Sequence, residues 1–293
     1  MTILYTPTEK GFDSRLEAID RCQVGLLREL ASQQGGRLIL KGGMAMRSVL
    51  GSMRLTKDID FDREQSLSQE ALRRGLRAQL IRAATTAGIK MPKVEFTKDT
   101  QTTVRARLAG SIAGGAEVRF DVEVSGRKAP ERGLVRTEIV KPPPRYGMAP
   151  FVVKTYTNEA LAAMKIAAAL SEQRNAPRDL YDLRDLIHAG ANPTELLAQQ
   201  DTDLLEDYVL RAPAKLEMLT FALAQQELLP YLPVEERALL TEDAWIDATL
   251  MIADHITRWC KDALELQRQR ASAEAPQGIN AESPVSAQKP PKG

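Results

Sequence analysis

The sequence is poor in several features that mark particular classes of protein. Only two of its 293 residues are cysteines, 5% are aromatic, and the formal net charge is +1. Two distant cysteines, Cys22 and Cys260, do not make the disulfide framework of a small secreted domain, and we expect both to be reduced core residues. A net charge this close to zero argues against a protein that coats nucleic acid by bulk attraction, although it leaves room for a local basic surface.

Long hydrophobic runs are also missing. No stretch of about 18 apolar residues occurs, which argues against a transmembrane helix. Residues 1–10 lack the basic start and the apolar core of a secretory signal peptide. We therefore expect a soluble, cytoplasmic protein without membrane association. Hydrophobic residues still make up 43% of the chain, enough for a sizeable core.

The first half of the chain alternates between helical and strand-like patterns. Apolar residues at helical spacing predict helices over 13–34 and 68–87, with a short helical segment over 44–50. Alternating or continuous apolar runs predict strands over 37–40, 58–61, 93–96, 102–108 and 116–124. Residues 125–150 are rich in proline, glycine and basic residues, and we expect them to be mostly loop.

The second half is helical by composition. We expect an Ala- and Leu-rich helix over 158–172 capped by Asn158, and a second helix over 177–188. Further helices over 195–269 should be broken near Pro213 and near 230–233. The predicted fold class is α+β, with a mixed-sheet α/β domain over 1–150, an all-helical domain over 151–269 and a disordered tail over 270–293.

Two glycines and two aspartates form the strongest chemical signal. Asp58 and Asp60 alternate along a predicted strand, so they share one face about 6–7 Å apart and repel each other unless a cation lies between them. Oxygen ligands favour Mg²⁺ or Mn²⁺ over zinc. The preceding Gly42 and Gly43 would let backbone N–H groups approach a phosphate, and Thr56 would add a hydroxyl contact.

Each part of this pattern has an ordinary structural explanation when it stands alone. An Asp-x-Asp pair can be a solvated strand edge, and a Gly-Gly pair can be a simple turn. The combination of strand, Gly-Gly, helix and Asp-x-Asp strand in one short segment is far more specific. A third carboxylate, Asp121, shares a strand face with Glu123 and could bind a metal or accept the proton of an acceptor hydroxyl, unless that face is merely exposed.

The predicted helices of the second half carry a lysine and two acids. Lys165 lies among apolar neighbours and needs an anion, which NTP phosphates would supply, unless the side chain reaches solvent. Asp179 and Asp182 share a helix face, so one of them could orient Lys165 or accept a proton. Arg178 could pair with a phosphate or a carboxylate. Surface salt bridges at a helix N-terminus are the alternative interpretation.

Together these motifs resemble the nucleotidyltransferase fold of the polymerase-beta type. A lysine-bearing helix followed by Arg-Asp-x-x-Asp at 178–182 is similar to the AbiEii/AbiGii toxin family, and the resemblance covers roughly residues 36–190. It implies a Mg²⁺-dependent nucleotidyltransferase toxin of a type IV toxin–antitoxin or abortive-infection (anti-phage) system. Related toxins add nucleotides from an NTP to the acceptor 3′ end of tRNA, which blocks translation.

The resemblance also implies a partner, an antitoxin with a winged helix-turn-helix domain, and leaves a direct complex with it open. By position it matches Thr56, Asp58 and Asp60 to the metal and phosphate motif, Lys165 to the helical lysine, and Asp179 and Asp182 to the final acidic motif. Asp121 is a weaker match. Together with the residue patterns, the resemblance predicts three groups of site residues. The metal ligands are Asp58, Asp60 and Asp121, and the catalytic residues are Asp58, Asp60, Asp121, Lys165, Asp179 and Asp182. The NTP-binding residues are Lys41, Gly42, Gly43, Arg54, Thr56, Lys165 and Arg178.

Two basic segments could bind the phosphate backbone of an RNA acceptor, unless they are ordinary solvated faces. They are the predicted loop with Arg127, Lys128, Arg132, Arg136, Lys141 and Arg145, and the predicted helix with Arg73, Arg74, Arg77 and Arg82. Two other functions are compatible with the same fold. The protein could be a small-molecule (antibiotic) or protein nucleotidyltransferase, or it could be a non-catalytic binding module.

Overall fold

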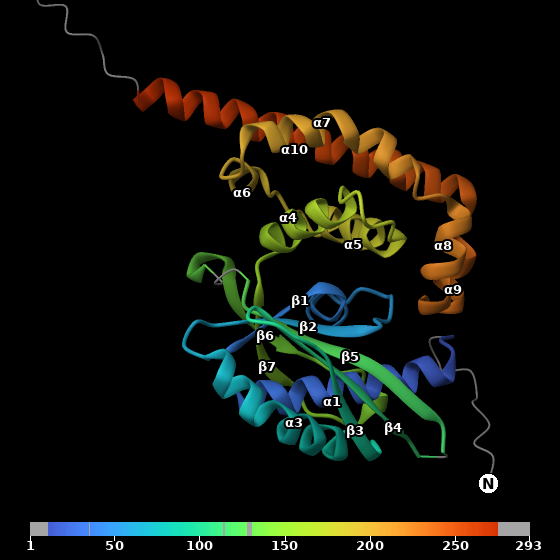
Figure 1. Ribbon diagram of the computed structural model, residues 1–293. Coiled ribbons are helices and arrows are strands. Elements are labelled where there is room, and N and C mark those ends of the chain that lie inside the picture. Colours follow the sequence, from blue (N-terminus) through green and yellow to red (C-terminus); the bar gives the residue numbers. More distant parts are fainter. Residues whose placement is uncertain (1–10, 35, 114, 128–130, 275–293) are drawn as a thin grey trace, which may run out of the picture.

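The computed structural model describes residues 11–34, 36–113, 115–127 and 131–274, and it has an α+β fold (Figure 1). A mixed sheet with two helices beneath it forms one half of the molecule, and a set of helices above the sheet forms the other. The predicted fold class is therefore confirmed. In the described part of the chain, no helix combines the length and the apolar character needed to cross a membrane.

Among the described residues, seven strands form one sheet in the order β3-β4-β5-β2-β1-β7-β6. Strand β2 is central, and it pairs in parallel with β5 and antiparallel with β1. Strand β7 pairs in parallel with β1 and antiparallel with the edge strand β6. The strands are β1 (Leu38–Lys41), β2 (Asp58–Arg63), β3 (Lys90–Asp99), β4 (Thr103–Ser111), β5 (Glu117–Ser125), β6 (Val135–Val140) and β7 (Phe151–Tyr156).

Helices α1 (Ser14–Gln33) and α3 (Gln69–Thr86) cover one face of the sheet. Asp13 caps α1 by accepting hydrogen bonds from two backbone N–H groups, and Ser68 caps α3 by accepting one, from Ala71. Every fourth residue of α3 from Leu72 to Leu80 is buried against the strands, as the helical spacing predicted. The opposite face of the sheet looks toward the helical half.

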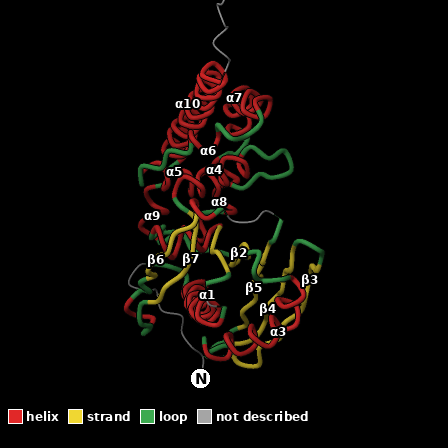
Figure 2. The backbone as a smooth tube through the Cα atoms, turned by 90° about the vertical axis from the view of Figure 1, so that its left-hand side faces the viewer, coloured by secondary structure: helices red, strands yellow, loops and turns green. Residues whose placement is uncertain are grey.

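The helical half begins directly after β7, and it is stacked on the sheet in both views (Figures 1 and 2). Its buried side chains form a second apolar cluster around Trp245 and Trp259, while the first cluster lies around the sheet. The first helix of this half contributes to both clusters. The helices are α4 (Asn158–Ala169), α5 (Pro177–His188), α6 (Thr194–Leu197), α7 (Thr202–Glu217), α8 (Phe221–Glu227), α9 (Val234–Leu239) and α10 (Glu242–Glu274).

The segment expected to be loop contains a strand, and a second strand follows it. Strand β6 lies inside the predicted loop of 125–150, and β7 extends the sheet past the expected end of the first domain at residue 150. The flanking prolines concealed β6, whose Val-Arg-Thr-Glu-Ile-Val sequence carries charges that only an edge strand tolerates well. The last strand of the sheet therefore ends at Tyr156, shortly before α4 begins.

Several helix ends also differ from expectation. Pro213 lies inside α7 instead of breaking it, because its exposed position lets solvent take up the helix carbonyl that loses its bond. The cap of α4 is Thr157, not Asn158. Helix α10 continues through residues 270–274, which were expected to be disordered, and the remainder of the predicted tail, 275–293, lies outside the described residues.

Candidate active site

The two aspartates of β2 lie on the sheet face that looks toward the helical half. Ile59 is fully buried between them on the other face, beside the helices α1 and α3. In the parallel register with β5, Asp58 is opposite Asp121 and Asp60 is opposite Glu123. The structure thus brings the third predicted carboxylate beside the first two.

These carboxyl groups are held in an environment that disfavours their charge. Burial, together with the neighbouring Asp58 and Glu123, raises the pKa of Asp60 to about 6. Burial also raises the pKa of Asp58, and Arg178 partly opposes that effect. A cation bound between the two aspartates would relieve both costs.

The donor set suits a hard divalent cation at Asp58 and Asp60. Magnesium is commonly held by one or two carboxylates together with substrate phosphates, so a full protein cage is not required. Among the described residues, no three His, Cys, Asp or Glu side chains form a ready metal site. Asp121 is instead engaged by Arg107, with an Nε–Oδ1 distance of 2.9 Å. Asp121 can join such a site only when this arginine moves away.

The Gly-Gly turn is pressed against the aspartates. Gly42 begins α2 (Gly42–Ala45) with a left-handed φ of 65°, and a Cβ there would lie 2.7 Å from Asp60 Oδ2. A Cβ on Gly43 would lie 2.7 Å from Thr56 Oγ1 and 2.8 Å from Arg54 Nη2. Only glycine fits at either position without displacing a predicted site residue.

Two other predicted phosphate contacts are occupied within the chain. The Thr56 hydroxyl donates to the Asp58 carbonyl oxygen at 3.1 Å. This hydrogen bond fixes the segment before β2 against the first residue of the strand. Lys41 Nζ donates to Asp62 Oδ1 at 2.6 Å, and the Tyr156 hydroxyl donates to the other oxygen of that carboxylate. Lys41 therefore stabilises the neighbouring carboxylate in this state.

Asp179 and Asp182 of α5 form the centre of a buried ion network. Lys165 Nζ lies 2.8 Å from Asp179 Oδ1 and 2.5 Å from Asp182 Oδ2. Arg54 donates to both oxygens of Asp182 at 2.7 Å, and Arg174 donates to Asp179 at 2.6 Å. The anion that the sequence required for Lys165 is thus supplied by α5.

This network keeps both of its aspartates ionised. Burial alone would raise the pKa of Asp179 and of Asp182, since neither exposes any surface. Lys165 with Arg174 outweighs burial at Asp179, Arg54 with Lys165 does so at Asp182, and both pKa values fall below the usual range. Groups this acidic and this enclosed are poor proton acceptors, and their geometry fits them to position cations.

The loop between α2 and β2 contacts the helical half at further points. Ser52 Oγ donates to Asp185 Oδ2 at 2.7 Å, and the Leu55 N–H donates to the Tyr231 carbonyl at 2.8 Å. Lys57 Nζ lies 4.9 Å from the centre of the Tyr231 ring. No sequence motif marked Tyr231 or Ser52 as a neighbour of the site.

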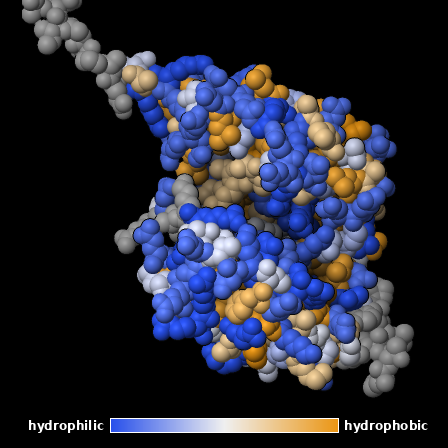
Figure 3. Space-filling view, in the orientation of Figure 1, coloured by the Kyte–Doolittle hydropathy of each residue, from blue (hydrophilic) through white to orange (hydrophobic). Residues whose placement is uncertain are grey.

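A cleft of about 290 Å³ opens beside Asp58. The space-filling view shows the surface hollowed between the sheet and the helical half (Figure 3). The polar residues that line the cleft are Thr56, Lys57, Asp58, Arg107, Arg119, Asp121 and Tyr231. Carboxylates, cations and an open entrance for substrate are therefore combined at one end of the sheet.

A family model described as "Nucleotidyl transferase AbiEii toxin, Type IV TA system" matches residues 25–270. The chain belongs to the AbiEii nucleotidyltransferase toxin family. The match extends well beyond the segment over which the motifs alone showed the resemblance, and it includes most of the helical half. A type IV toxin–antitoxin family implies an antitoxin partner. No curated protein gives a significant match.

Solved structures agree on the fold. JHP933 from Helicobacter pylori is 17% identical with a TM-score of 0.51, and the comparison covers 89% of this chain and 97% of that one. A candidate nucleotidyltransferase from H. pylori is 18% identical with a TM-score of 0.54, covering 90% and 98% of the two chains. MenT4, a nucleotidyltransferase toxin from Mycobacterium tuberculosis, is 19% identical with coverage of 91% and 94%, but its TM-score of 0.46 is too low for a detailed fold comparison.

Most arginines of the two basic segments predicted to bind an acceptor pair with other residues or lie away from the carboxylates. The arginines of α3 lie on the opposite face of the sheet, where Arg73 pairs with Asp99 and Arg77 stacks on Phe96. Arg136 pairs with Glu138, and Arg145 pairs with Glu17. Lys128 and the side chain of Arg132 lie outside the described residues. The cations next to the carboxylates are instead Arg105, Arg107 and Arg119, which sequence reasoning missed because their position depends on strand register.

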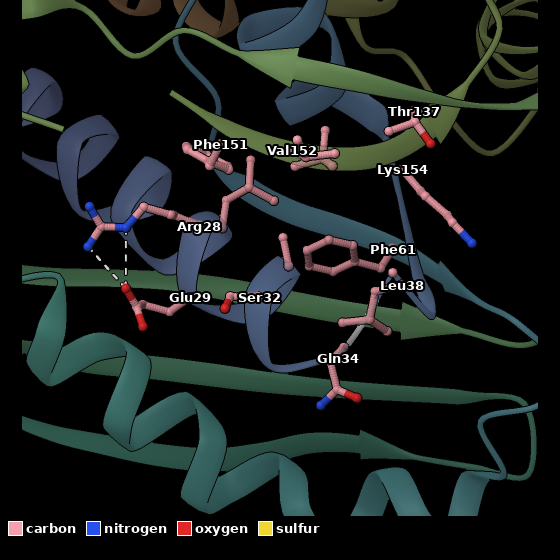
Figure 4. Close-up of a pocket in the computed structure, with 14 residues that line it drawn as sticks. Arg28, Glu29, Ser32, Gln34, Leu38, Phe61, Thr137, Phe151, Val152 and Lys154 are labelled. Atoms are coloured by element: carbon pink, nitrogen blue, oxygen red, sulfur yellow. Dashed lines mark hydrogen bonds and ion pairs between the residues drawn. The ribbon is translucent and has the colours of Figure 1, made fainter. Parts of the chain in front are cut away.

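A second cavity of about 510 Å³ lies between α1 and β7, on the face away from the carboxylates (Figure 4). Apolar side chains such as Leu38, Phe61 and Phe151 provide much of its lining. Its charged groups are already paired, Arg28 with Glu29 at 3.0 Å and Lys154 with Glu64 at 2.7 Å. This cavity lacks the concentration of carboxylates that distinguishes the cleft at Asp58.

Proposed function

We propose that this nucleotidyltransferase transfers a nucleotide from an NTP to the 3′ hydroxyl at the acceptor end of tRNA. A tRNA extended in this way cannot be charged, so translation stops. The observation that carries the proposal is the alignment of Asp58, Asp60 and Asp121 on neighbouring strands beside the Gly-Gly turn, in a cleft bordered by cations. The reaction would take place in the cytoplasm, where tRNA is abundant.

The charge around the cleft favours an anionic acceptor over a cationic drug. Lys57, Arg107 and Arg119 line it, and Arg178 acts on Asp58 from α5. A site built for an aminoglycoside-like cation would need acidic groups at its rim in place of these. A non-catalytic module would have no use for two aspartates kept at raised pKa beside a phosphate-binding turn.

In the proposed reaction the 3′ hydroxyl oxygen attacks the α-phosphorus of the NTP in line with the leaving group. The bond from that phosphorus to the bridging oxygen breaks, and pyrophosphate leaves. Asp58 and Asp60 would hold Mg²⁺, Asp121 would join them once Arg107 moves away, and the metal would supply charge neutralisation on the phosphates. Asp121 lies on the open side of the pair and is the carboxylate best placed to accept the hydroxyl proton.

The remaining residues position these groups. The backbone N–H groups of the Gly42–Gly43 turn would contact the phosphates. The Arg54 guanidinium lies against the Gly-Gly turn, and Asp182 accepts hydrogen bonds from it. Lys165 is within electrostatic reach of Asp60 and completes the positive side of the site.

Transfer of α-³²P label from each of the four NTPs to total tRNA tests this function. We expect label in the presence of Mg²⁺ with the wild-type chain, none with EDTA, and none with Asp60→Asn, a variant that keeps the shape of the side chain. Absence of label with every NTP would reject tRNA as the acceptor. Full activity of Asp60→Asn would reject the metal assignment.

A further inference from the structure

The sheet has an open charged face beside the cleft. On β3, β4 and β5, apolar residues such as Val94, Leu108 and Val122 are buried on the α3 side. The alternate residues point the other way, and they are half-buried or exposed. Their cations form what we call the sheet-face cluster: Lys93, Lys98, Arg105, Arg107 and Arg119.

Strand register makes this face continuous with the catalytic carboxylates. One cross-strand row runs from Asp58 through Asp121 and Arg107 to Glu95. The next row runs from Asp60 through Glu123 and Arg105 to Lys98. Neighbouring strands lie about 4.8 Å apart, so the outermost cations are roughly 15 Å from the aspartates of β2. A ligand on this face therefore reaches the site without crossing any other element.

The cluster contains both engaged and available cations. Arg105 and Arg107 pair with Glu123 and Asp121, yet their side chains remain 44% and 33% exposed. Lys93 and Arg119 are exposed, and no ion pair holds either of them among the described residues. Away from the two carboxylates that belong to the site, positive groups outnumber negative ones on this face, where the other acids are Glu95 and Glu117.

We propose that the sheet-face cluster binds the phosphate backbone of the RNA acceptor and directs its 3′ end to Asp58 and Asp60. The inference rests on the proposed function for the choice of acceptor. Exposed arginines and lysines on an extended surface match a chain of phosphates, because each contact releases counterions and contributes without reading base sequence. Binding should accordingly be strongly salt-dependent and tolerant of RNA sequence.

The test measures binding, separately from transfer. Fluorescence anisotropy of 5′-labelled total tRNA, without NTP, compares the wild-type chain with the double variant Lys93→Ala/Arg119→Ala. Each phosphate contact should contribute roughly 5-fold in 0.1 M salt, so affinity should fall roughly 25-fold and the dependence on salt should become shallower by about 1.4 logarithmic units per decade. The matched control, Arg74→Ala/Arg82→Ala, removes two exposed arginines from α3 on the opposite side of the sheet.

The control variant should bind tRNA within about 2-fold of wild type, because surface charges beyond roughly 10 Å are screened. Equal losses in the two variants, unchanged binding in the sheet-face variant, or no binding by wild type would each overturn the inference. Transfer of label by wild type is scored in parallel. If tRNA is labelled but the sheet-face variant binds normally, the sheet-face cluster is not the RNA-binding surface and the proposed function stands. If no label transfers, the proposed function fails, and the binding data still test whether the cluster binds RNA.

Discussion

A half-buried pair of aspartates on β2 and a buried pair on α5 lie on the two sides of the interface between the sheet and the helices, and their pKa values shift in opposite directions. Asp58 and Asp60 have raised pKa values, whereas Asp179 and Asp182 have lowered ones. The difference lies in the balance between burial and ion pairing, because cations paired directly with the α5 aspartates outweigh their burial, whereas burial dominates at the β2 pair and nearby cations only partly oppose it. The β2 pair has too few neighbouring cations to offset its burial, so it can bind a metal ion. The α5 pair is already ion-paired and stabilises the structure.

Removing an acid from the α5 pair should produce the largest loss of stability. Asp182→Asn would leave Arg54 buried with an uncompensated charge and would remove one of the two carboxylates paired with Lys165, and we expect the free energy of unfolding to fall by about 3–5 kcal/mol. Urea denaturation at pH 7 measures this. A loss below about 1 kcal/mol would mean that the network adds little and that Asp182 has another role.

Asp60→Asn should have the opposite effect on stability while removing activity. In metal-free buffer we expect the variant to be more stable than wild type by about 2 kcal/mol at pH 7.5, less than the full effect of the pKa shift because the site is partly exposed. The reason is that the wild-type protein must keep a carboxylate ionised where burial disfavours its charge.

The difference in stability between Asp60→Asn and wild type should depend on pH. The folded pKa of about 6 is above the unfolded value of 3.8, so the contribution of Asp60 to stability is fully present below about pH 4 and is lost as pH rises from about 4 to about 6. The gap between variant and wild type should therefore open over that window. Added Mg²⁺ should narrow it at pH 7.5 by stabilising only the wild type. A gap that is independent of pH would rule out Asp60 as the titrating group.

Gly43→Ala tests whether the site depends on the close approach of the turn. The new Cβ would meet Thr56 and Arg54 within 2.8 Å, so we expect a loss of about 1–3 kcal/mol in stability and a raised KM for NTP. Gly133→Ala is the matched control, because a Cβ there meets nothing within 4 Å and the backbone is not left-handed. Similar effects from both changes would point to backbone entropy rather than to the contact.

Some of this architecture could be predicted from sequence because it depends on local spacing. The face shared by Asp58 and Asp60, the Gly-Gly turn and the buried stripe of α3 all follow from the periods of strands and helices. Contacts that join distant segments could not be predicted in the same way. The Arg54–Asp182 ion pair spans 128 positions, and the arginines beside Asp121 depend on a cross-strand register that no local pattern specifies. For the same reason β6 was taken for loop, since its pairing partner was itself unrecognised.

The smallest expected effect concerns a third aspartate of α5, which is intermediate between the two pairs. Asp185 has 18% of its side chain exposed, and it pairs with Arg184 while accepting a hydrogen bond from Ser52 at 2.7 Å. Because the arginine remains when the hydroxyl is removed, Ser52→Ala should cost only about 1 kcal/mol in the free energy of unfolding. Urea denaturation alongside Asp182→Asn measures both changes under one condition. If Ser52→Ala proved as damaging as Asp182→Asn, the stability of the interface would depend on the loop between α2 and β2 rather than on cation saturation, and the contrast between the two aspartate pairs would lose its physical basis.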